Sequence, residues 1–372
     1  MSNYYKSMHE LVGHTPLVSL GRLRPLPDGV RLFAKLELWN PSGSVKDRIG
    51  IYMLKEAEEK GLITPGRSVL VAPTAGNTGL GIAFAALEKG YRTIFVIPTK
   101  FSPEKQTLIR ALGGEIINTP REGGMLEAEA RAQQIVARNP DAVILNQFKT
   151  QSNPLAHYEG TGPEIWADLD GRVDYVVAGA GSGGTFSGVM KYLKERSPDI
   201  KGVLADPVGS TMGGGEYGDY NIEGIGNDFI PETMDMSLVD RVVKITDEDA
   251  YRFSSDLAKT EGIFAGSSSG GALSAASKLI DDGVRGNIVV ILPDRGDRYF
   301  SRELYVCFVR CGGTGCNPLH LSHMLKFDTG YDRCIRIIQN DLVNGIMNID
   351  GERRYAVLTF LLSGLFKIKN QI

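Results

Sequence analysis

Short, continuously apolar runs alternate with helix-like segments along most of the chain, and this rhythm limits the folds open to it. The apolar runs occupy residues 69–72, 93–97, 143–145, 175–178, 203–205 and 288–292. Helical patterns follow the first two runs at 79–90 and 102–114, and the second pattern opens on a serine and closes on glycines. Strands that are apolar along their whole length are covered on both faces. We therefore expect an open, mostly parallel α/β architecture with ligands at the carboxyl ends of its strands.

This rhythm stops after Ser301, and the remaining residues differ in composition. Residues 307–372 contain all four cysteines and no recognisable strand-helix period, so we treat them as a tail of unknown order behind a core of residues 1–306. Three of these cysteines and two histidines have loosely zinc-like spacings that fit no standard zinc finger, and we expect no metal site. These residues are Cys307, Cys311, Cys316, His320 and His323.

Charge and hydropathy exclude two classes of partner. Lysine and arginine number 41 against 44 acidic residues, a formal net charge of −3 without a long run of one sign, so we expect no nucleic-acid partner. No stretch reaches the roughly 18 apolar residues that a membrane-spanning helix needs. The first residues also lack an apolar run behind a basic region, and we expect a soluble, cytoplasmic protein.

One lysine stands where a turn meets a helix. Residues 40–48 read NPSGSVKDR, in which a Pro/Gly turn delivers Lys46 to the start of a helical pattern. A lysine so placed can form a Schiff base with an aldehyde cofactor and later serve as a general base. An exposed loop is the alternative interpretation.

Three glycine-rich or serine-rich turns precede helices. Residues 73–79 (PTAGNTG) and 181–185 (GSGGT) each lie between a strand and a helix, where backbone amides can hold a carboxylate or phosphate. For 73–79 a simple capped turn is equally consistent with the sequence. Residues 266–271 (GSSSGG) could supply hydroxyls to a ring nitrogen, but taken alone they favour helix capping.

A rival interpretation uses the same glycines. Gly179, Gly181 and Gly184 match G-x-G-x-x-G, and Asp206 follows the next strand. This weak match is the only support for a nicotinamide-dependent oxidoreductase.

Taken together, these segments resemble the pyridoxal-phosphate β-family, with its tryptophan-synthase-β-like fold, and within it cysteine synthase and cystathionine β-synthase. The resemblance extends from about Leu11 to Ser301. Its motifs occur in the order NPSGSVKDR, PTAGNTG, NPLAHYEGTGPEIW, GSGGTFSGV, EGIGNDFIP, GSSSGGA and LPDRGDRY.

The resemblance implies roles for individual residues. Lys46 would carry pyridoxal 5'-phosphate as a Schiff base and move the α-proton, Asn77 would bond the phenolic oxygen of the cofactor, and Ser268 would face its pyridine nitrogen. The phosphate would lie in a cradle formed by Gly181, Ser182, Gly183, Gly184 and Thr185. The substrate carboxylate would bind Thr74, Ala75, Thr78 and Gln147, and Gly226 would border the side-chain end of the pocket.

The resemblance also implies a reaction and an assembly. A neutral serine at the pyridine nitrogen damps the electron sink, which favours β-replacement through an aminoacrylate over transamination. The active site would lie between two lobes, a smaller mobile one at about 36–146 and a larger one at about 11–35 plus 147–306. We expect a homodimer, without the haem or adenosylmethionine regulation of animal relatives.

Two features bear on the substrates. Ala75 stands where cysteine synthases usually have serine, and residues 206–226 resemble the longer Gly-Gly loop of bacterial enzymes that join O-acetylserine to homocysteine. We therefore expect O-acetyl-L-serine or L-serine as donor and homocysteine as acceptor, giving cystathionine. The alternative is a cysteine synthase that uses sulfide; more distant ones are a serine dehydratase and an inactive binding scaffold.

Overall fold

The structure is a computed structural model that describes residues 4–74, 76–99, 101–302 and 304–305. Ala75 and the tail with its zinc-like spacing lie outside the described residues.

The larger of two sheets has six strands in the order β1-β2-β10-β7-β8-β9. Only β1 and β2 pair antiparallel; the other neighbours are parallel. Its strands are β1 (Leu17–Ser19), β2 (Val30–Leu36), β7 (Tyr175–Gly179), β8 (Lys201–Pro207), β9 (Arg241–Ile245) and β10 (Gly286–Leu292).

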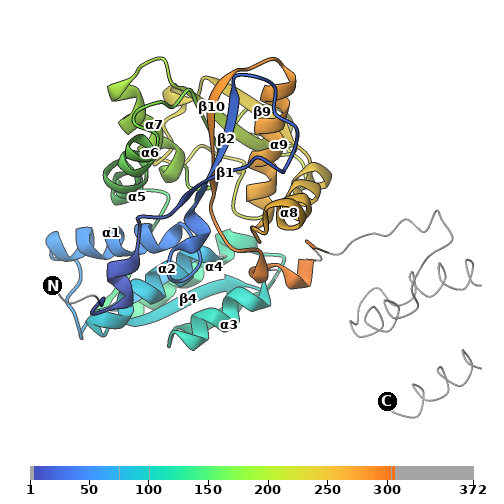
Figure 1. Cartoon of the computed structure of the whole chain (residues 1–372). Coiled ribbons are helices and arrows are strands. Elements are labelled where there is room, and N and C mark those ends of the chain that lie inside the picture. Colours follow the sequence, from blue (N-terminus) through green and yellow to red (C-terminus); the bar gives the residue numbers. More distant parts are fainter. Residues whose placement is uncertain (1–3, 75, 100, 303, 306–372) are drawn as a thin grey trace, which may run out of the picture. The chain divides into compact units, whose positions relative to one another are not determined.

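The smaller sheet has four parallel strands in the order β5-β4-β3-β6. They are β3 (Val69–Pro73), β4 (Arg92–Pro98), β5 (Glu115–Thr119) and β6 (Ala142–Ile144). Figure 1 shows β4 beside α3 and α4 in the lower half of the view, and β2, β9 and β10 in the upper half. The two sheets confirm the expected open, mostly parallel α/β architecture.

Helices flank both sheets (Figure 1). The α-helices are α1 (Lys46–Glu59), α2 (Asn77–Ala86), α3 (Pro103–Ala111), α4 (Gly124–Arg138), α5 (Ser152–Ala156), α6 (Gly162–Asp168), α7 (Gly184–Arg196), α8 (Asp247–Glu261) and α9 (Ser267–Asp281). Short 3-10 turns are η1 (Met8–Leu11), η2 (Glu37–Trp39), η3 (Leu87–Lys89), η5 (Met236–Leu238), η6 (Gly296–Arg298) and η7 (Phe300–Arg302), and η4 (His157–Thr161) is a π-helical turn. The serine expected to cap α3, Ser102, accepts a hydrogen bond from the backbone N–H of Lys105, which confirms that cap.

Each sheet is buried on both faces. In β7, Val177 faces a core with α8 and α9, whereas Val176 and Ala178 face a second core that contains residues of α6 and α7. In β3, Leu70 packs with α1 and α2, and Val71 packs with α4. This double burial explains why these strands are continuous apolar runs in the sequence.

Helices α1 and α2 approach each other closely at two glycines. A Cβ atom on Gly50 would lie 2.2 Å from the carbonyl oxygen of Gly81, and one on Gly81 would lie 2.2 Å from the carbonyl oxygen of Lys46. Only glycine fits at such backbone contacts. The first residue of α1 is therefore held directly against α2.

Candidate active site

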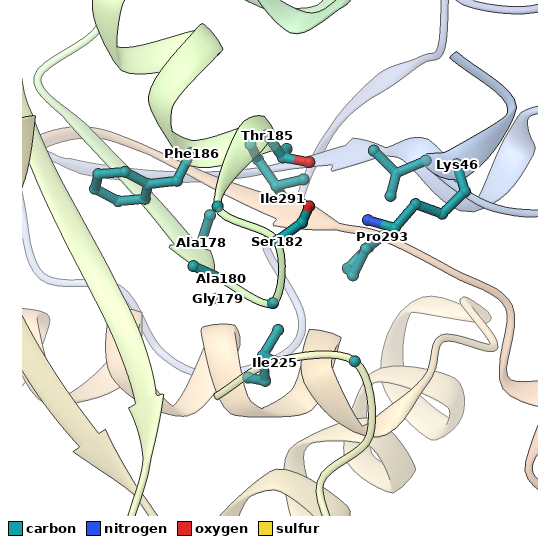
Figure 2. A pocket seen from close by; sticks show the side chains of 14 residues that line it. Lys46, Ala178, Gly179, Ala180, Ser182, Thr185, Phe186, Ile225, Ile291 and Pro293 are labelled. Atoms are coloured by element: carbon teal, nitrogen blue, oxygen red, sulfur yellow. The ribbon is translucent and has the colours of Figure 1, made fainter. Parts of the chain in front are cut away.

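A pocket lies at the carboxyl ends of β7 and β10, where ligands were expected. Its lining includes Lys46 from the start of α1, Pro293 from the end of β10, and residues of the turn between β7 and α7. Figure 2 shows the Lys46 amine pointing toward Ser182, in the turn that leads to Thr185 at the start of α7. Of the predicted site residues, this pocket brings together Lys46, Gly181, Ser182, Gly183 and Thr185.

Lys46 is held in place by the end of β10. The backbone N–H of Val45 donates to the carbonyl of Pro293 at 2.8 Å, and Ser44 forms a β-bridge with Asp294. Burial lowers the pKa of Lys46 to about 8, while the carboxylate of Asp294 acts in the opposite direction. An amine with this pKa can both accept and release a proton near neutral pH.

The turn before α7 presents backbone donors to the pocket. Within the described part of the chain, the N–H groups of residues 181–185 donate to no protein acceptor. They lie at the N-terminus of a helix of 13 residues, whose dipole favours an anion. The hydroxyl groups of Ser182, in the turn, and Thr185, in the first turn of α7, also line the pocket. This donor set fits a phosphate group.

Glycine is required at three positions of this cradle. A Cβ atom on Gly181 would lie 2.4 Å from the carbonyl oxygen of Gly224, and one on Gly184 would lie 2.0 Å from the side-chain oxygen of Asn153. Gly183 has a φ of +82°, and a Cβ there would meet Met234 at 2.4 Å. The cradle can therefore form only with glycine at these positions.

Residues far away in the sequence hold the cradle, and sequence reasoning did not identify them. Asn153 donates from Nδ2 to Ser182 Oγ at 2.9 Å, and Asn227 donates to the carbonyl of Gly181 at 2.5 Å. Thr233 donates to the carbonyl of Ser182. The EGIGNDFIP and NPLAHYEG motifs contain two of these residues, which was the one available signal.

His157 supports Thr185 from the π-helical turn. Its Nε2 lies 3.1 Å from Thr185 Oγ1, and its Nδ1 lies 2.9 Å from Thr161 Oγ1. Burial lowers the pKa of His157 well below its usual value, and the charges of Arg48 and Lys46 lower it further. The imidazole is therefore neutral and positions Thr185 through hydrogen bonds.

The residues predicted to bind a substrate carboxylate lie at the start of α2 and after β6. Thr78 Oγ1 donates to Gln147 Oε1 at 2.5 Å, and Thr74 Oγ1 accepts from the N–H of Gly76 at 3.5 Å. Helix α2 begins without a side-chain cap, so the capped-turn alternative for residues 73–79 is wrong. Gly226 donates its N–H to Ala180 at 2.8 Å, next to Ile225 in the pocket lining. Ala75 lies outside the described residues.

The serine cluster at 266–271 does not cap its helix. The N-cap of α9 is Gly266, with no side-chain hydrogen bond. Ser267 Oγ instead accepts from the backbone N–H of Glu223, and Ser269 Oγ has no partner among the described residues. The capping interpretation is therefore wrong. Ser268 is buried in the first turn of α9, outside the pocket lining near Lys46.

Asn77 is engaged by two residues that follow β10. Its Nδ2 donates to Asp294 Oδ2 at 2.6 Å, and its Oδ1 accepts from Arg298 at 2.7 Å. Sequence reasoning gave neither Asp294 nor Arg298 a role, although both lie in the LPDRGDRY motif. One of the two Nδ2 hydrogens remains for another acceptor.

The dinucleotide interpretation fails at its acidic residue. Asp206 is fully buried, and its Oδ2 accepts from the N–H of Gly213 at 3.1 Å and from Lys244 at 2.5 Å. Oδ2 of this carboxylate therefore already accepts hydrogen bonds from two protein donors. Among the described residues, no group of three or more His, Cys, Asp or Glu side chains could hold a metal, and no helix there is long and apolar enough to cross a membrane.

Comparisons with known proteins agree with this geometry. The model of the pyridoxal-phosphate dependent enzyme family matches residues 8–294. The chain is 45% identical to the O-acetylserine dependent cystathionine beta-synthase of Bacillus subtilis over 297 residues, which cover 80% of this chain and 96% of that protein. It is 43% identical to cysteine synthase A of Escherichia coli K12, with 82% and 97% of the two chains covered.

A solved structure shows the same fold. The O-acetylserine dependent cystathionine beta-synthase of Helicobacter pylori superposes with a TM-score of 0.77 at 40% identity, covering 82% of this chain and all of that one. The comparisons confirm the expected fold class, enzyme class and cofactor. They also contradict the oxidoreductase alternative. The chain belongs to the pyridoxal-phosphate dependent enzyme family.

Proposed function

We propose that the protein catalyses β-replacement on O-acetyl-L-serine, with homocysteine as acceptor and cystathionine as product. The observation that carries this proposal is the half-buried Lys46 side chain, whose amine points toward a helix-terminal cradle of backbone N–H groups that have no acceptor among the described residues. An amine and a phosphate seat in one pocket are what pyridoxal phosphate requires. The names of the similar proteins in B. subtilis and H. pylori support the choice of substrates.

Residues of four chain segments would hold the cofactor. The N–H groups of residues 181–185 would bind its phosphate, the Lys46 amine its aldehyde carbon, and Asn77 Nδ2 its phenolic oxygen. Ser268 would face the ring nitrogen. When bound, pyridoxal phosphate supplies the electron sink for bond changes at the α-carbon and β-carbon of the substrate.

Lys46 would transfer the α-proton. Because its pKa is about 8 rather than 10.5, about a tenth of the amine is unprotonated at pH 7 once it is released from the aldehyde. It accepts the α-proton as the acetate leaves, and returns a proton to the α-carbon after the acceptor thiolate has bonded to the β-carbon. No other lysine lines the described pocket.

The substrate carboxylate would bind at the N-terminus of α2. There Thr78 donates to Gln147 Oε1, which leaves the Gln147 Nε2 hydrogens available to an anion. The Thr74 hydroxyl and the backbone N–H of Asn77, in the first turn of α2, would supply further donors. Gly226 would border the side-chain end of the pocket; its φ of +81° and the Tyr220 hydroxyl, 2.7 Å from where a Cβ would lie, favour glycine at this position.

Products distinguish this proposal from its alternatives. We expect the purified full-length chain, given O-acetylserine, to form cystathionine from homocysteine with a higher kcat/KM than cysteine from sulfide. The reverse order would assign a cysteine synthase, which the E. coli relative makes a specific second candidate. Pyruvate from serine without a thiol product would indicate a dehydratase. Lys46→Ala should abolish turnover, and retained activity would contradict the mechanism.

We also infer a homodimer in the cytoplasm, with a smaller lobe at about 36–146 that closes over the substrate. An ion pair supports contact between the lobes, because Lys105 of α3 binds Glu223 of the larger lobe at 2.8 Å. Sedimentation as a monomer would contradict the dimer. Small-angle scattering should give a smaller radius of gyration when O-acetylserine is added, and an unchanged radius would contradict closure.

A further inference from the structure

The carboxylate of Asp294 lies beside the candidate site and has no assigned role. Asp294 is 1% exposed, two residues beyond the end of β10. Its Oδ2 accepts hydrogen bonds from Asn77 Nδ2 and from the Tyr299 hydroxyl, both at 2.6 Å. Its Oδ1 is buried without a partner among the described residues. Burying a carboxylate with one unpaired oxygen is costly, so a stabilising role alone does not account for it.

The packing fixes where this carboxylate lies. A Cβ on Gly266 would be 2.2 Å from Asp294 Oδ1, so the first residue before α9 must be glycine for the carboxylate to fit. The backbone N–H of Gly266 donates to the Asp294 carbonyl at 3.0 Å. The Ser44 β-bridge holds Asp294 from the other side. Its position is therefore set by the segment that carries Lys46 and by the N-terminus of α9.

Asp294 and Arg298 together fix the amide of Asn77. Because Oδ1 of Asn77 accepts from Arg298, the amide cannot flip without placing an NH₂ group against a guanidinium and an oxygen against a carboxylate. The guanidinium is itself anchored by a hydrogen bond to the carbonyl of Ser42. The remaining Nδ2 hydrogen is thus presented in one direction.

The charged and titratable groups around Lys46 come from several elements. Asp294 follows β10, and its charge raises the pKa of Lys46 against the larger effect of burial. His157 faces Lys46 from the π-helical turn and is neutral. Asp47 follows Lys46 in the sequence; burial raises the pKa of Asp47 to about 6, and the charge of Arg298 lowers it in part. The β-bridge between Ser44 and Asp294 brings this carboxylate next to the segment that carries Lys46.

We propose that Asp294 is a positioning residue of the active site, which orients the Asn77 amide toward the cofactor and places a negative charge beside Lys46. The inference rests on the proposed function, since it assumes that pyridoxal phosphate binds beside Asn77. Asp294 itself touches Asn77 and Tyr299 rather than the reacting atoms.

A double-mutant cycle on cofactor binding tests the first part. Asp294→Asn keeps an oxygen acceptor for Asn77 but removes the charge, and charge-assisted bonds are roughly twice as strong as neutral ones. We expect it to weaken pyridoxal phosphate binding to the cofactor-free full-length chain by about fivefold. In an Asn77→Ala background the same change should have a smaller effect, because the hydrogen bond between Asn77 and Asp294 is already gone.

The pH dependence of Lys46 labelling tests the second part without the cofactor. The mid-point for modification of Lys46 by an amine reagent, followed by mass spectrometry of its peptide, should lie near pH 8 in the wild type. Asp294→Asn should move it down by about one pH unit. Tyr299→Phe removes the other donor to Oδ2 but leaves the charge, so its mid-point should stay near the wild-type value.

Asp206→Asn is the matched control. Asp206 is also buried at the carboxyl end of a strand and also has an unpartnered Oδ1, but it lies outside the pocket lining. It should change neither the cofactor affinity nor the Lys46 mid-point. The inference would be overturned if Asp294→Asn left both the affinity for pyridoxal phosphate and the mid-point of Lys46 labelling at their wild-type values. It would also be overturned if Asp206→Asn changed them as much as Asp294→Asn does. Neither result would contradict the proposed function. A wild-type chain that takes up no pyridoxal phosphate would overturn the proposed function itself.

Discussion

Replacing Gly81 with alanine tests how the α1–α2 contact positions Lys46. The added Cβ would lie 2.2 Å from the Lys46 carbonyl oxygen and 2.6 Å from its carbonyl carbon. Ordinary contacts between such atoms are about 3.5 Å, so the helices must separate by about 1 Å. Both clashing atoms belong to backbone, so no side-chain rotation relieves the contact.

Two opposing terms set the expected magnitude. Alanine in a helix interior is favoured over glycine by about 1 kcal/mol. Overpacking costs about 1–3 kcal/mol, with the upper end expected for a backbone contact. We therefore expect Gly81→Ala to lower the free energy of unfolding by about 2 kcal/mol. A displacement of about 1 Å at Lys46 should also lower kcat by about a hundredfold.

Urea unfolding of the cofactor-free chain and turnover of the loaded enzyme measure the two effects. Gly21→Ala is the control, because a Cβ at Gly21 meets nothing within 4 Å, and it should stay within about 0.5 kcal/mol of the wild type. A Gly81→Ala protein that is as stable as the wild type, or more stable, would refute the argument that α2 fixes the Lys46 backbone.

Three further substitutions test separate features. His14→Asn should raise the free energy of unfolding by about 0.5–1 kcal/mol, since His14 has a φ of +46° that asparagine adopts more readily; an unchanged urea midpoint would contradict this. Glu37→Gln should cost about 3 kcal/mol in the same assay, because the fully buried Glu37 accepts two 2.8 Å bonds from Arg48; a loss below about 1 kcal/mol would count against it. Lys46→Met should stabilise the cofactor-free chain at pH 7 by about 3 kcal/mol, which corresponds to the lowering of the lysine pKa from 10.5 to about 8. Between pH 8 and pH 10.5 the unfolded wild-type chain binds more protons at Lys46 than the folded chain does, so the free energy of unfolding of the wild type rises with pH in this range. The difference in stability between Lys46→Met and the wild type should therefore shrink from pH 8 to pH 10.5. A difference that stays constant over this range would contradict the argument.

The strands that the sequence predicted are those with two apolar faces. β2 escaped prediction because charged residues interrupt its apolar pattern, and one of them is buried. Lys35 in that strand is 0% exposed and pairs with Glu164 at 3.0 Å and Asp168 at 3.2 Å. A buried, compensated charge looks like a surface residue in the sequence. The other missed strands, β1, β5 and β9, lie at sheet edges, where one side has no neighbour. The edge strand β6 was predicted, because it is a continuous apolar run.

The candidate site also has a part that the sequence predicts and a part that only the fold reveals. The phosphate cradle was predictable because its donors are five consecutive residues between a strand and a helix. Its supports were not, since Asn153 and Asn227 meet the cradle only through the fold. The prediction that the serine cluster at 266–271 caps its helix was wrong because a distant residue decides the N-cap. Local preference favours a serine at the N-cap, but the carboxylate of Asp294 occupies the space beside Gly266.

The place and the proton affinity of Lys46 thus depend on residues from distant parts of the chain. The backbone of Gly81 packs against the first residue of α1. The segment after β10 places the Pro293 carbonyl at the Val45 N–H, and the charge of Asp294 in that segment acts on the Lys46 amine. Burial by itself would push the lysine pKa further down, and the carboxylate offsets part of that change. Since the same carboxylate holds Asn77, a single substitution at Asp294 should disturb both the orientation of the cofactor and the protonation of the lysine. A substitution at Tyr299 removes only a hydrogen bond, so comparing the two separates charge from geometry.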